Sequence, residues 1–280
     1  MLVCSDTHWA SPNCPEGGVD PQAESCMLQA MEIVKPDIFC HIGDAGEWNP
    51  ASLWKFSRRK RPPVDGYILN SVDPKRCDLY EDIIAVNEGL DKIDARLTAA
   101  DEYRKAAGKA VVASRRIMIE GNHEVWVDNL LLENPAFNSA TNPWGKPGWS
   151  PDRLMQLKKR KWDYIPHGEV FYVGRLGMYH GGHYSTTYHA ARHLAEYSSS
   201  IMYAHTHDQQ SAKKATLGEP IGGWSIGCLC DMDKPFMKGK PTRWSHAFAI
   251  VHFREGGRFN VEIVEIFDGR CWVYGQEIVG

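Results

Sequence analysis

Five short clusters of Asp, Asn and His each follow directly after an apolar run that predicts a β-strand. The clusters are Asp6-Thr7-His8, Gly43-Asp44, Gly121-Asn122-His123-Glu124, His180-Gly181-Gly182-His183 and His205-Thr206-His207. Side chains that follow the carboxyl ends of parallel strands meet in one crevice of an open α/β sheet. The sequence therefore predicts that five distant segments build a single site, which requires a fold that brings their strands together.

Residues 2–42 have the order strand, helix, strand. Residues 2–5 and 37–42 are apolar runs that predict buried strands, and Asp20-Pro21 lies between them. Asp favours the N-cap of a helix and Pro its first position, so a helix is expected to start there. A βαβ unit of this kind predicts a sheet that is at least partly parallel.

The remainder of the chain predicts a layered α/β fold. A long helix is expected from about residue 80 to 107, because Ile84, Leu90, Ile93 and Leu97 recur at roughly helical spacing. Strands are expected at 117–119, 170–173, 176–180, 201–204, 247–253 and 259–266, and a further helix at 187–197. We expect a four-layer αββα sandwich of two mixed β-sheets flanked by helices.

We expect residues 1–280 to form a single domain that carries a helical insertion at about residues 50–115. The stretch between Asp44 and Asn122 is longer than two adjacent site loops require. We therefore predict that the insertion forms a helical cap over the site and selects the substrate.

The composition excludes several classes of protein. The chain has 32 basic and 35 acidic side chains and a formal net charge of −3, which argues against a basic nucleic-acid clamp. Hydrophobic residues make up 43% and charged residues 24%, as in a globular protein rather than a disordered one. The N-terminal residues have no signal-peptide pattern, and no apolar run reaches the roughly 18 residues of a membrane span. We expect a cytoplasmic protein without membrane contact and with reduced thiols.

The residue types in the five clusters suit a transition-metal centre. Two carboxylates, one carboxamide and several imidazoles suit manganese, iron, nickel or zinc better than calcium. The pairs Asp6/His8 and His205/His207 place alternate residues on one side of an extended segment, so each pair can reach a common centre. A carboxylate shared by two ions about 3.5 to 4 Å apart would hold a bridging water and direct it at phosphorus. By contrast, Cys228-Leu229-Cys230 has no second cysteine pair nearby, and we do not expect zinc there.

The ordered motifs D-x-H, G-D, G-N-H-E, H-G and H-x-H resemble those of the calcineurin-like metallophosphoesterases, from Asp6 to His207. The resemblance implies two metal positions that share one carboxylate. The implied ligands are Asp6, His8 and His207 for the first metal, Asp44 as the bridge, and Asn122, His180 and His205 for the second. The implied cofactors are two divalent or transition-metal ions, manganese first, with iron, zinc or nickel as alternatives.

The resemblance also implies a reaction in which a metal-bridging hydroxide attacks phosphorus. It gives His123 the role of contacting the substrate phosphate and assisting the leaving oxygen, and Glu124 the role of orienting His123. His183 lies three positions after an implied ligand. It is either a further contact to substrate or an ordinary surface or core histidine.

Departures from the family pattern indicate which branch of the family the chain resembles more. The protein Ser/Thr phosphatase branch has Gly after its D-x-H and an Asp-Arg-Gly soon after its G-D, whereas this chain has Trp9 and Ala45-Gly46-Glu47. Its His180-Gly181-Gly182 does resemble the H-G-G of that branch. Ala204 stands where phosphodiesterase-like members usually have Gly, and we expect only a slightly altered turn. We favour a phosphodiesterase acting on a nucleotide or nucleic acid. The alternatives are a phosphomonoesterase or protein phosphatase, or a binding module with a relic metal site.

Tryptophans and basic runs bear on the substrate, which we expect to be a phosphate ester. Trp9, Trp48 and Trp126 each follow a motif residue within four positions, and indoles beside a phosphate site can stack nucleobases. Packing beneath the loops is the commoner use of such residues. Residues 55–61 and 158–162 are basic and either bind a phosphate backbone or form solvated surfaces. The natural substrate, the native metals and the oligomeric state stay open.

Overall fold

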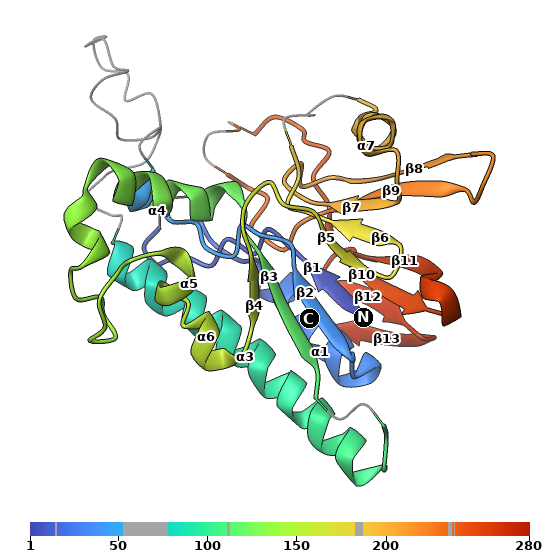
Figure 1. Ribbon diagram of the computed structural model, residues 1–280, viewed down its shortest axis with the longest axis horizontal. Coiled ribbons are helices and arrows are strands. Elements are labelled where there is room, and N and C mark those ends of the chain that lie inside the picture. The colour runs from blue at the N-terminus through green and yellow to red at the C-terminus, as the bar shows by residue number, and fades with distance from the viewer. Residues whose placement is uncertain (15, 53–77, 111–112, 183–186, 235–236, 238) are drawn as a thin grey trace.

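The computed structural model describes residues 1–280 except 15, 53–77, 111–112, 183–186, 235–236 and 238. Six strands form one sheet in the order β11-β10-β1-β2-β3-β4 (Figure 1). Their bounds are β1 Leu2–Cys4, β2 Ile38–His41, β3 Arg115–Ile119, β4 Asp163–Ile165, β10 His246–Phe253 and β11 Phe259–Ile266. Strands β1 to β4 pair in parallel, whereas β10 and β11 are antiparallel to their neighbours. The expected βαβ unit is confirmed by the parallel pairing of β1 with β2.

A second sheet of five strands has the order β5-β6-β7-β9-β8. Its bounds are β5 Phe171–Val173, β6 Leu176–Met178, β7 Ile201–Tyr203, β8 Gln209–Lys214 and β9 Ile221–Ile226. Strands β6, β7 and β9 are parallel, and β5 and β8 are antiparallel edge strands. A separate C-terminal hairpin consists of β12 Arg270–Val273 and β13 Gln276–Val279.

The helices lie on the outer faces of the two sheets and on the connections between strands. The α-helices are α1 Pro21–Val34, α3 Leu79–Ala106, α4 Asn122–Glu133, α5 Pro151–Leu154, α6 Leu157–Arg160 and α7 His189–Tyr197. Short 3₁₀ helices occur at η1 Asn49–Ala51, η4 Pro135–Asn138 and η6 Glu255–Gly257. None of the helices in these described stretches combines the length and the apolar character that a membrane span requires.

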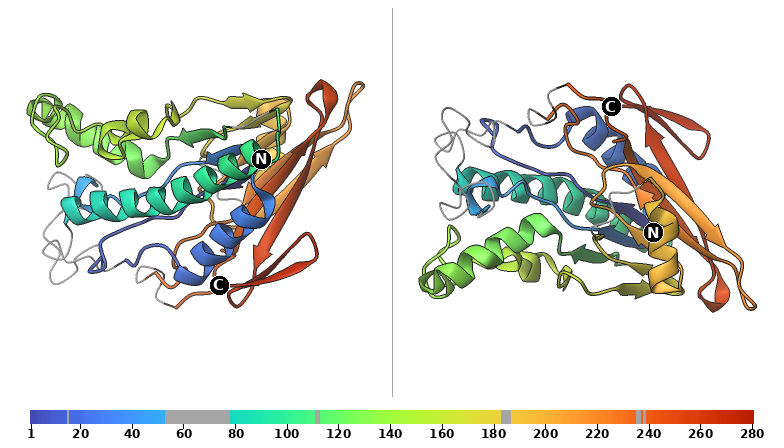
Figure 2. Two further views of the ribbon diagram at one scale, coloured as in Figure 1. Left: turned by 90° about the horizontal axis from the view of Figure 1, so that it is seen from below. Right: turned by 90° about the horizontal axis from the view of Figure 1, so that it is seen from above.

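Alternation along the strands separates the interior into layers. Leu2 and Phe39 belong to the core that the six-stranded sheet shares with α1 and α3, whereas their neighbours Val3 and Cys40 belong to the core between the two sheets. This is the period of two that a β-strand imposes on its side chains. Helix α7 packs on the far face of the five-stranded sheet, against β8 and β9. The result is an α/β sandwich with α1 and α3 side by side on one outer face (Figure 2) and α7 on the other.

Helix α3 is the part of the predicted insertion that the structure describes at length. It packs beside α1, and its side chains Ile83, Val86, Leu90, Ile93 and Leu97 are buried in the core of the six-stranded sheet. It therefore belongs to the flanking layer. Residues 53–77 lie outside the described residues, so the cap over the site stays a prediction.

Candidate metal centre

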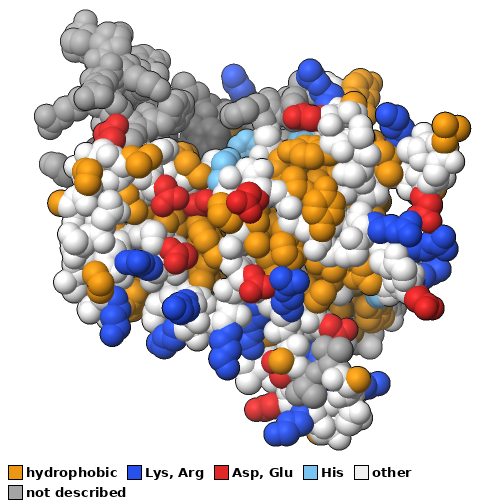
Figure 3. Space-filling model, in the orientation of Figure 1, with side chains coloured by type: hydrophobic (Ala, Val, Ile, Leu, Met, Phe, Trp, Pro, Cys, Tyr) orange, Lys and Arg blue, Asp and Glu red, His pale blue; other side chains and the backbone are white. Residues whose placement is uncertain are grey.

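The fold brings all five sequence clusters to the carboxyl ends of parallel strands. Asp6, Asp44 and Asn122 follow β1, β2 and β3 of the six-stranded sheet, and His180 and His205 follow β6 and β7 of the five-stranded sheet. The two sheets therefore contribute to one site from opposite sides. A small group of His side chains reaches the surface near the upper centre of Figure 3.

The first set of expected ligands is tightly grouped. The Nε2 atom of His207 lies 3.1 Å from Asp6 Oδ1 and 3.3 Å from His8 Nε2. His8 Nε2 is 3.8 Å from Asp6 Oδ1 and 3.9 Å from Asp44 Oδ2. Asp6, His8 and His207 are all buried. Their donor atoms point toward a common volume next to Asp44.

The second set is grouped near the same oxygen of Asp44, Oδ2. His180 Nε2 lies 3.2 Å from Asp44 Oδ2 and 3.0 Å from Asn122 Oδ1. Asp44, His180 and His205 each offer a ligand atom within 4.8 Å of the others. The Asp44 carboxylate thus lies between the two sets, where a carboxylate shared by two ions would have to lie.

Several of these side chains are held by unusual backbone conformations. Asp6, His8, Asp44, His205 and His207 all have positive φ angles, between 47° and 71°. Non-glycine residues rarely adopt this left-handed region, at a cost of about 1 to 2 kcal/mol per residue. Backbone hydrogen bonds between segments hold the loops in place, including Asp6 N–H to the Gly43 carbonyl (3.1 Å) and His8 N–H to the Asp44 carbonyl (3.1 Å). Such residues cluster at sites where the surrounding fold fixes the local geometry.

His123 lies at the edge of the group, held by Glu47. Its Nδ1 is 2.8 Å from the Glu47 carbonyl oxygen, and its backbone N–H donates to Asp44 Oδ1 at 2.8 Å. Its Nε2 is 3.9 Å from Asp44 Oδ2. A carbonyl oxygen only accepts, so the proton on this side belongs to Nδ1. His123 therefore presents its Nε2 on the side of Asp44.

Glu124 does not hold His123, contrary to what the resemblance implies. Its buried carboxylate accepts hydrogen bonds from five N–H groups, those of Asp44, Ala45, Gly46, Gly121 and the Trp48 indole. Burial, and next the charge of Asp44, raise the pKa of Glu124. These hydrogen bonds attach the loop that contains Asp44 to the first turn of α4. The ring of His123 is oriented by Glu47 instead.

The electrostatics of the group fit a cationic occupant. Burial by itself would raise the pKa of Asp6, but the adjacent His207 outweighs it and lowers the pKa to about 2. Burial likewise opposes ionisation of Asp44, but His180 and His123 lower its pKa well below the usual range. Asp6 Oδ1 is buried, and His207 Nε2 lies 3.1 Å from it without a well-directed hydrogen bond. A buried carboxylate oxygen beside inward-facing imidazole nitrogens is a donor set for a metal ion.

The imidazoles of the group differ in their affinity for protons. Burial lowers the pKa of His205 to about 4, with His180 as the next cause. Burial also opposes protonation of His180, but Asp44 outweighs it and raises the pKa to about 9. His180 Nδ1 lies 2.7 Å from the Ile42 carbonyl oxygen, which leaves Nε2 to face Asp44 and Asn122. A metal ion that displaced this proton would find Nε2 already aimed at the shared volume.

Three supporting residues were not predicted from the sequence. Glu47 Oε2 lies 2.9 Å from His8 Nδ1, and the buried Lys234 Nζ lies 3.7 Å from the same oxygen. Cys230 Sγ lies 3.7 Å from His207 Nδ1. Outer contacts of this kind orient the metal-binding nitrogen of a histidine. Glu47 could have been found as an acid three positions after Asp44, whereas Lys234 has no local signal that would link it to the site.

Cys230 belongs to the Cys228-Leu229-Cys230 pair, where no zinc site was expected. The structure places Cys230, but not Cys228, in a group with His8 and His207 whose ligand atoms lie within 4.8 Å of one another. The backbone N–H of Leu229 donates to the Asp6 carbonyl at 3.1 Å, which ties this segment to the first cluster. The thiol is thus a neighbour of the histidine set and not half of a separate cysteine site.

The three tryptophans have different environments. Trp9 and Trp48 are buried, and their indole N–H groups donate to Glu24 at 2.8 Å and Glu124 at 3.0 Å, so they support the loops from beneath. Trp126 is half-buried and lies against His123, with ring centroids 3.8 Å apart. Trp244, which the sequence did not single out, lies against His207 with centroids 4.1 Å apart.

Only the second of the two basic runs lies in the part of the chain that the structure describes. Residues 55–61 and His183 lie outside the described residues. In the second run, Arg160 pairs with Asp91 at 2.6 Å and with Asp94 at 2.7 Å, and the buried Trp162 donates to Asp94 at 2.9 Å. These contacts attach α6 to α3, so this part of the run stabilises the fold.

The arrangement can hold two cations around one shared carboxylate and places a histidine, His123, beside them. Such a centre can polarise a phosphoryl or carbonyl oxygen and activate a water molecule. No protein-family model matches the chain, and no curated protein matches it.

Proposed function

We propose that the chain is a metal-dependent phosphoesterase. The observation that carries the proposal is the convergence of the seven expected ligands, from five segments and both sheets, around the Asp44 carboxylate. Two ions held there would supply Lewis acidity and a water molecule of lowered pKa. The remaining steps depend on side chains of the chain itself.

His123 is the proposed proton donor. The Glu47 carbonyl accepts its Nδ1–H, so a second proton would reside on Nε2, on the side of the metal group. From that position Nε2 can donate to the oxygen that leaves phosphorus, a contribution of about 10² to 10⁴ in rate. Glu47 also contacts His8 through Oε2 and therefore couples the position of His123 to the first ligand set.

A diester with an aromatic substituent is the proposed substrate class, and a nucleotide or nucleic acid has that chemistry. Trp126 beside His123 and Trp244 beside His207 place a half-buried indole next to each of two site histidines. Stacking of a base on an aromatic side chain contributes about 1 to 3 kcal/mol. Two such surfaces would favour a phosphate with rings on its ester oxygens over a small monoester.

The test compares bis(p-nitrophenyl) phosphate with p-nitrophenyl phosphate in the presence of Mn²⁺. We expect the diester to be hydrolysed with the higher kcat/KM, and His123→Asn to lower kcat by about 10² or more while both metals stay bound. His252 is an exposed histidine on β10, and His252→Asn is the matched control that should leave both rates unchanged.

The outcomes separate the alternatives. Hydrolysis of the monoester alone would replace the diesterase with a phosphomonoesterase. Tight binding of two ions without hydrolysis of either ester would indicate a relic site. Loss of metal from His123→Asn would show that His123 is a ligand rather than a proton donor.

A further inference from the structure

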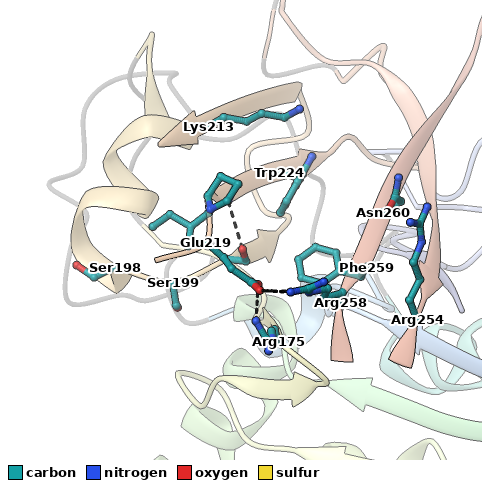
Figure 4. A pocket seen from close by; sticks show the side chains of 14 residues that line it. Arg175, Ser198, Ser199, Lys213, Glu219, Trp224, Arg254, Arg258, Phe259 and Asn260 are labelled. Atoms are coloured by element: carbon teal, nitrogen blue, oxygen red, sulfur yellow. Dashed lines mark hydrogen bonds and ion pairs between the residues drawn. The ribbon is translucent and has the colours of Figure 1, made fainter. Parts of the chain in front are cut away.

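A pocket lies at the opposite edge of the sandwich from the metal group. Strands β6 and β7 carry His180 and His205 after their last residues, and they carry Arg175 and Ser200 before their first ones. Arg175 and Ser200 line a pocket of 710 Å³ that is completed by the turns of β8–β9 and β10–β11 (Figure 4). Its volume falls within the roughly 300 to 1,000 Å³ of small-molecule sites.

The pocket is strongly cationic although the chain as a whole is acidic. Its lining contains Arg175, Lys213, Arg254 and Arg258 against a single acidic residue, Glu219. Figure 3 shows Lys and Arg side chains gathered beside acidic ones at the right-hand edge of the molecule, between the β8–β9 and β10–β11 turns. Positive charge in a concave surface raises the local concentration of anions.

The single carboxylate is shared by two guanidinium groups. Glu219 Oε1 accepts from Arg258 Nε at 3.2 Å and Nη2 at 2.9 Å, and its Oε2 accepts from Arg175 Nη1. Arg175 is held further by the Gly256 carbonyl at 3.1 Å. The carboxylate therefore holds two arginines from two different turns on one side of the pocket (Figure 4).

Two cations of the pocket have no acidic partner among the residues that the structure describes. Within the described ranges, no ion pair joins Lys213 or Arg254 to a carboxylate. Lys213 lies on β8 opposite Gly222, and Arg254 follows the last residue of β10. The two unpaired charges thus come from different sheets and face one pocket (Figure 4).

The floor of the pocket is aromatic and rigid. Trp224 on β9 meets Phe259 on β11 edge to face, with ring centroids 5.8 Å apart, and so joins the two sheets. The indole also covers Gly222, where a Cβ atom would lie 2.3 Å from the ring. A ligand entering here would meet fixed apolar rings below and positive charge around its rim.

We propose that this pocket binds a phosphorylated small molecule, with Lys213 and Arg254 as the principal contacts to its phosphate groups. Arginine and lysine donate charge-assisted hydrogen bonds to phosphate oxygens, and separate cations from two sheets suit a chain of phosphates better than a single one. The site is independent of the proposed phosphoesterase chemistry, because the two lie beyond opposite ends of β6 and β7.

The test is calorimetric titration of the metal-free protein, in chelator, with inorganic tripolyphosphate and with ATP. We expect saturable binding of both, and binding at least about tenfold weaker for the Lys213→Ala/Arg254→Ala variant. Glu219→Gln should bind more tightly, because it removes the carboxylate that competes with the ligand. Equal affinities for tripolyphosphate and ATP would indicate that the pocket recognises the phosphate chain alone. Tighter binding of ATP would indicate a further contact to its adenine ring. Both results support the site.

Matched variants identify the outcomes that overturn the proposal. Lys158→Ala/Lys159→Ala removes two exposed cations from α6, and it should leave the affinity unchanged. Equal weakening by both double variants would mean non-specific attraction, and no weakening by Lys213→Ala/Arg254→Ala would place the ligand elsewhere. Asp44→Asn should also bind normally, and loss of binding in that variant would assign the ligand to the metal group.

Discussion

The replacement of Glu124 by Gln tests what this residue does, because sequence resemblance and structure assign it different roles. The carboxylate is buried at the start of α4 and accepts five hydrogen bonds. Its Oε2 serves the N–H groups of Asp44 and Gly121, both at 2.9 Å. Its Oε1 serves the N–H groups of Ala45 (3.0 Å) and Gly46 (3.3 Å) and the Trp48 indole (3.0 Å).

The expected loss in the free energy of unfolding follows from the number of N–H donors that lose their acceptor. A carboxamide has one oxygen, so its best orientation keeps the three bonds of Oε1 and turns its NH₂ group toward the N–H groups of Asp44 and Gly121. A buried donor left without an acceptor costs about 1 to 3 kcal/mol. Glu124→Gln should therefore lower the free energy of unfolding by about 2 to 6 kcal/mol.

The assay is urea unfolding of the metal-free protein, with Glu133→Gln as the matched control. Glu133 is the exposed last residue of the same helix, and its replacement should change stability by less than about 0.5 kcal/mol. A loss below about 1 kcal/mol in Glu124→Gln, together with a large fall in kcat, would refute the structural account. It would return Glu124 to the role of orienting His123.

Three further predictions address other parts of the molecule. Burial raises the pKa of Asp82 from 3.8 to about 7, so the folded protein holds an extra proton between about pH 4 and pH 7 and loses stability as the pH rises through that window. In urea unfolding, the free energy of unfolding of Asp82→Asn should equal that of the wild type below pH 4 and exceed it above pH 7 by up to about 4 kcal/mol. Equal free energies of unfolding at pH 8 would contradict the raised pKa of Asp82. Cys230→Ala should weaken metal binding about 10- to 100-fold in a chelator competition, and Cys228→Ala should not, so equal effects would remove Cys230 from the site. Mn²⁺ at about 100 times its Kd should stabilise the protein by about 2.7 kcal/mol and raise its melting temperature, whereas a similar rise in Asp44→Asn would place the ion elsewhere.

Most of the central fold could be predicted because its signals are local. Apolar runs marked β1, β2 and β3, and Asp20-Pro21 marked the start of α1, where the Asp20 side chain does accept from the Ala23 N–H. Strand β8 gave no signal, because its sequence QQSAKK forms an edge strand that is largely exposed and has no apolar alternation. Helix α4 was missed because Gly121 and Glu124 read as parts of a motif loop, although the Glu124 carboxylate accepts a hydrogen bond from the Gly121 N–H as a helix cap.

The residues of the candidate site also fall into those that have a local sequence signal and those that have none. The grouping of the expected ligands could be predicted because each lies in a short motif after a strand, and their binding of metal stays a prediction. Cys230 and Trp244 contact the histidines only through tertiary structure, so no spacing in the sequence reveals them. Glu47 differs, because it lies only three positions after Asp44. The contacts of Glu124 also differ from those implied for it, since adjacency in sequence to His123 does not by itself produce contact when successive helical residues point about 100° apart.

The left-handed backbone at Asp6, His8, Asp44, His205 and His207 has a consequence for protein engineering. Five such conformations together oppose folding by roughly 5 to 10 kcal/mol, and the rest of the sandwich offsets that sum. Transfer of these five side chains alone to another sandwich, with extended backbone at the ends of its strands, would not reproduce the directions in which the side chains point. The transferable unit is the set of loops with their backbone hydrogen bonds, together with the Glu124 carboxylate that fastens the Asp44 loop to α4.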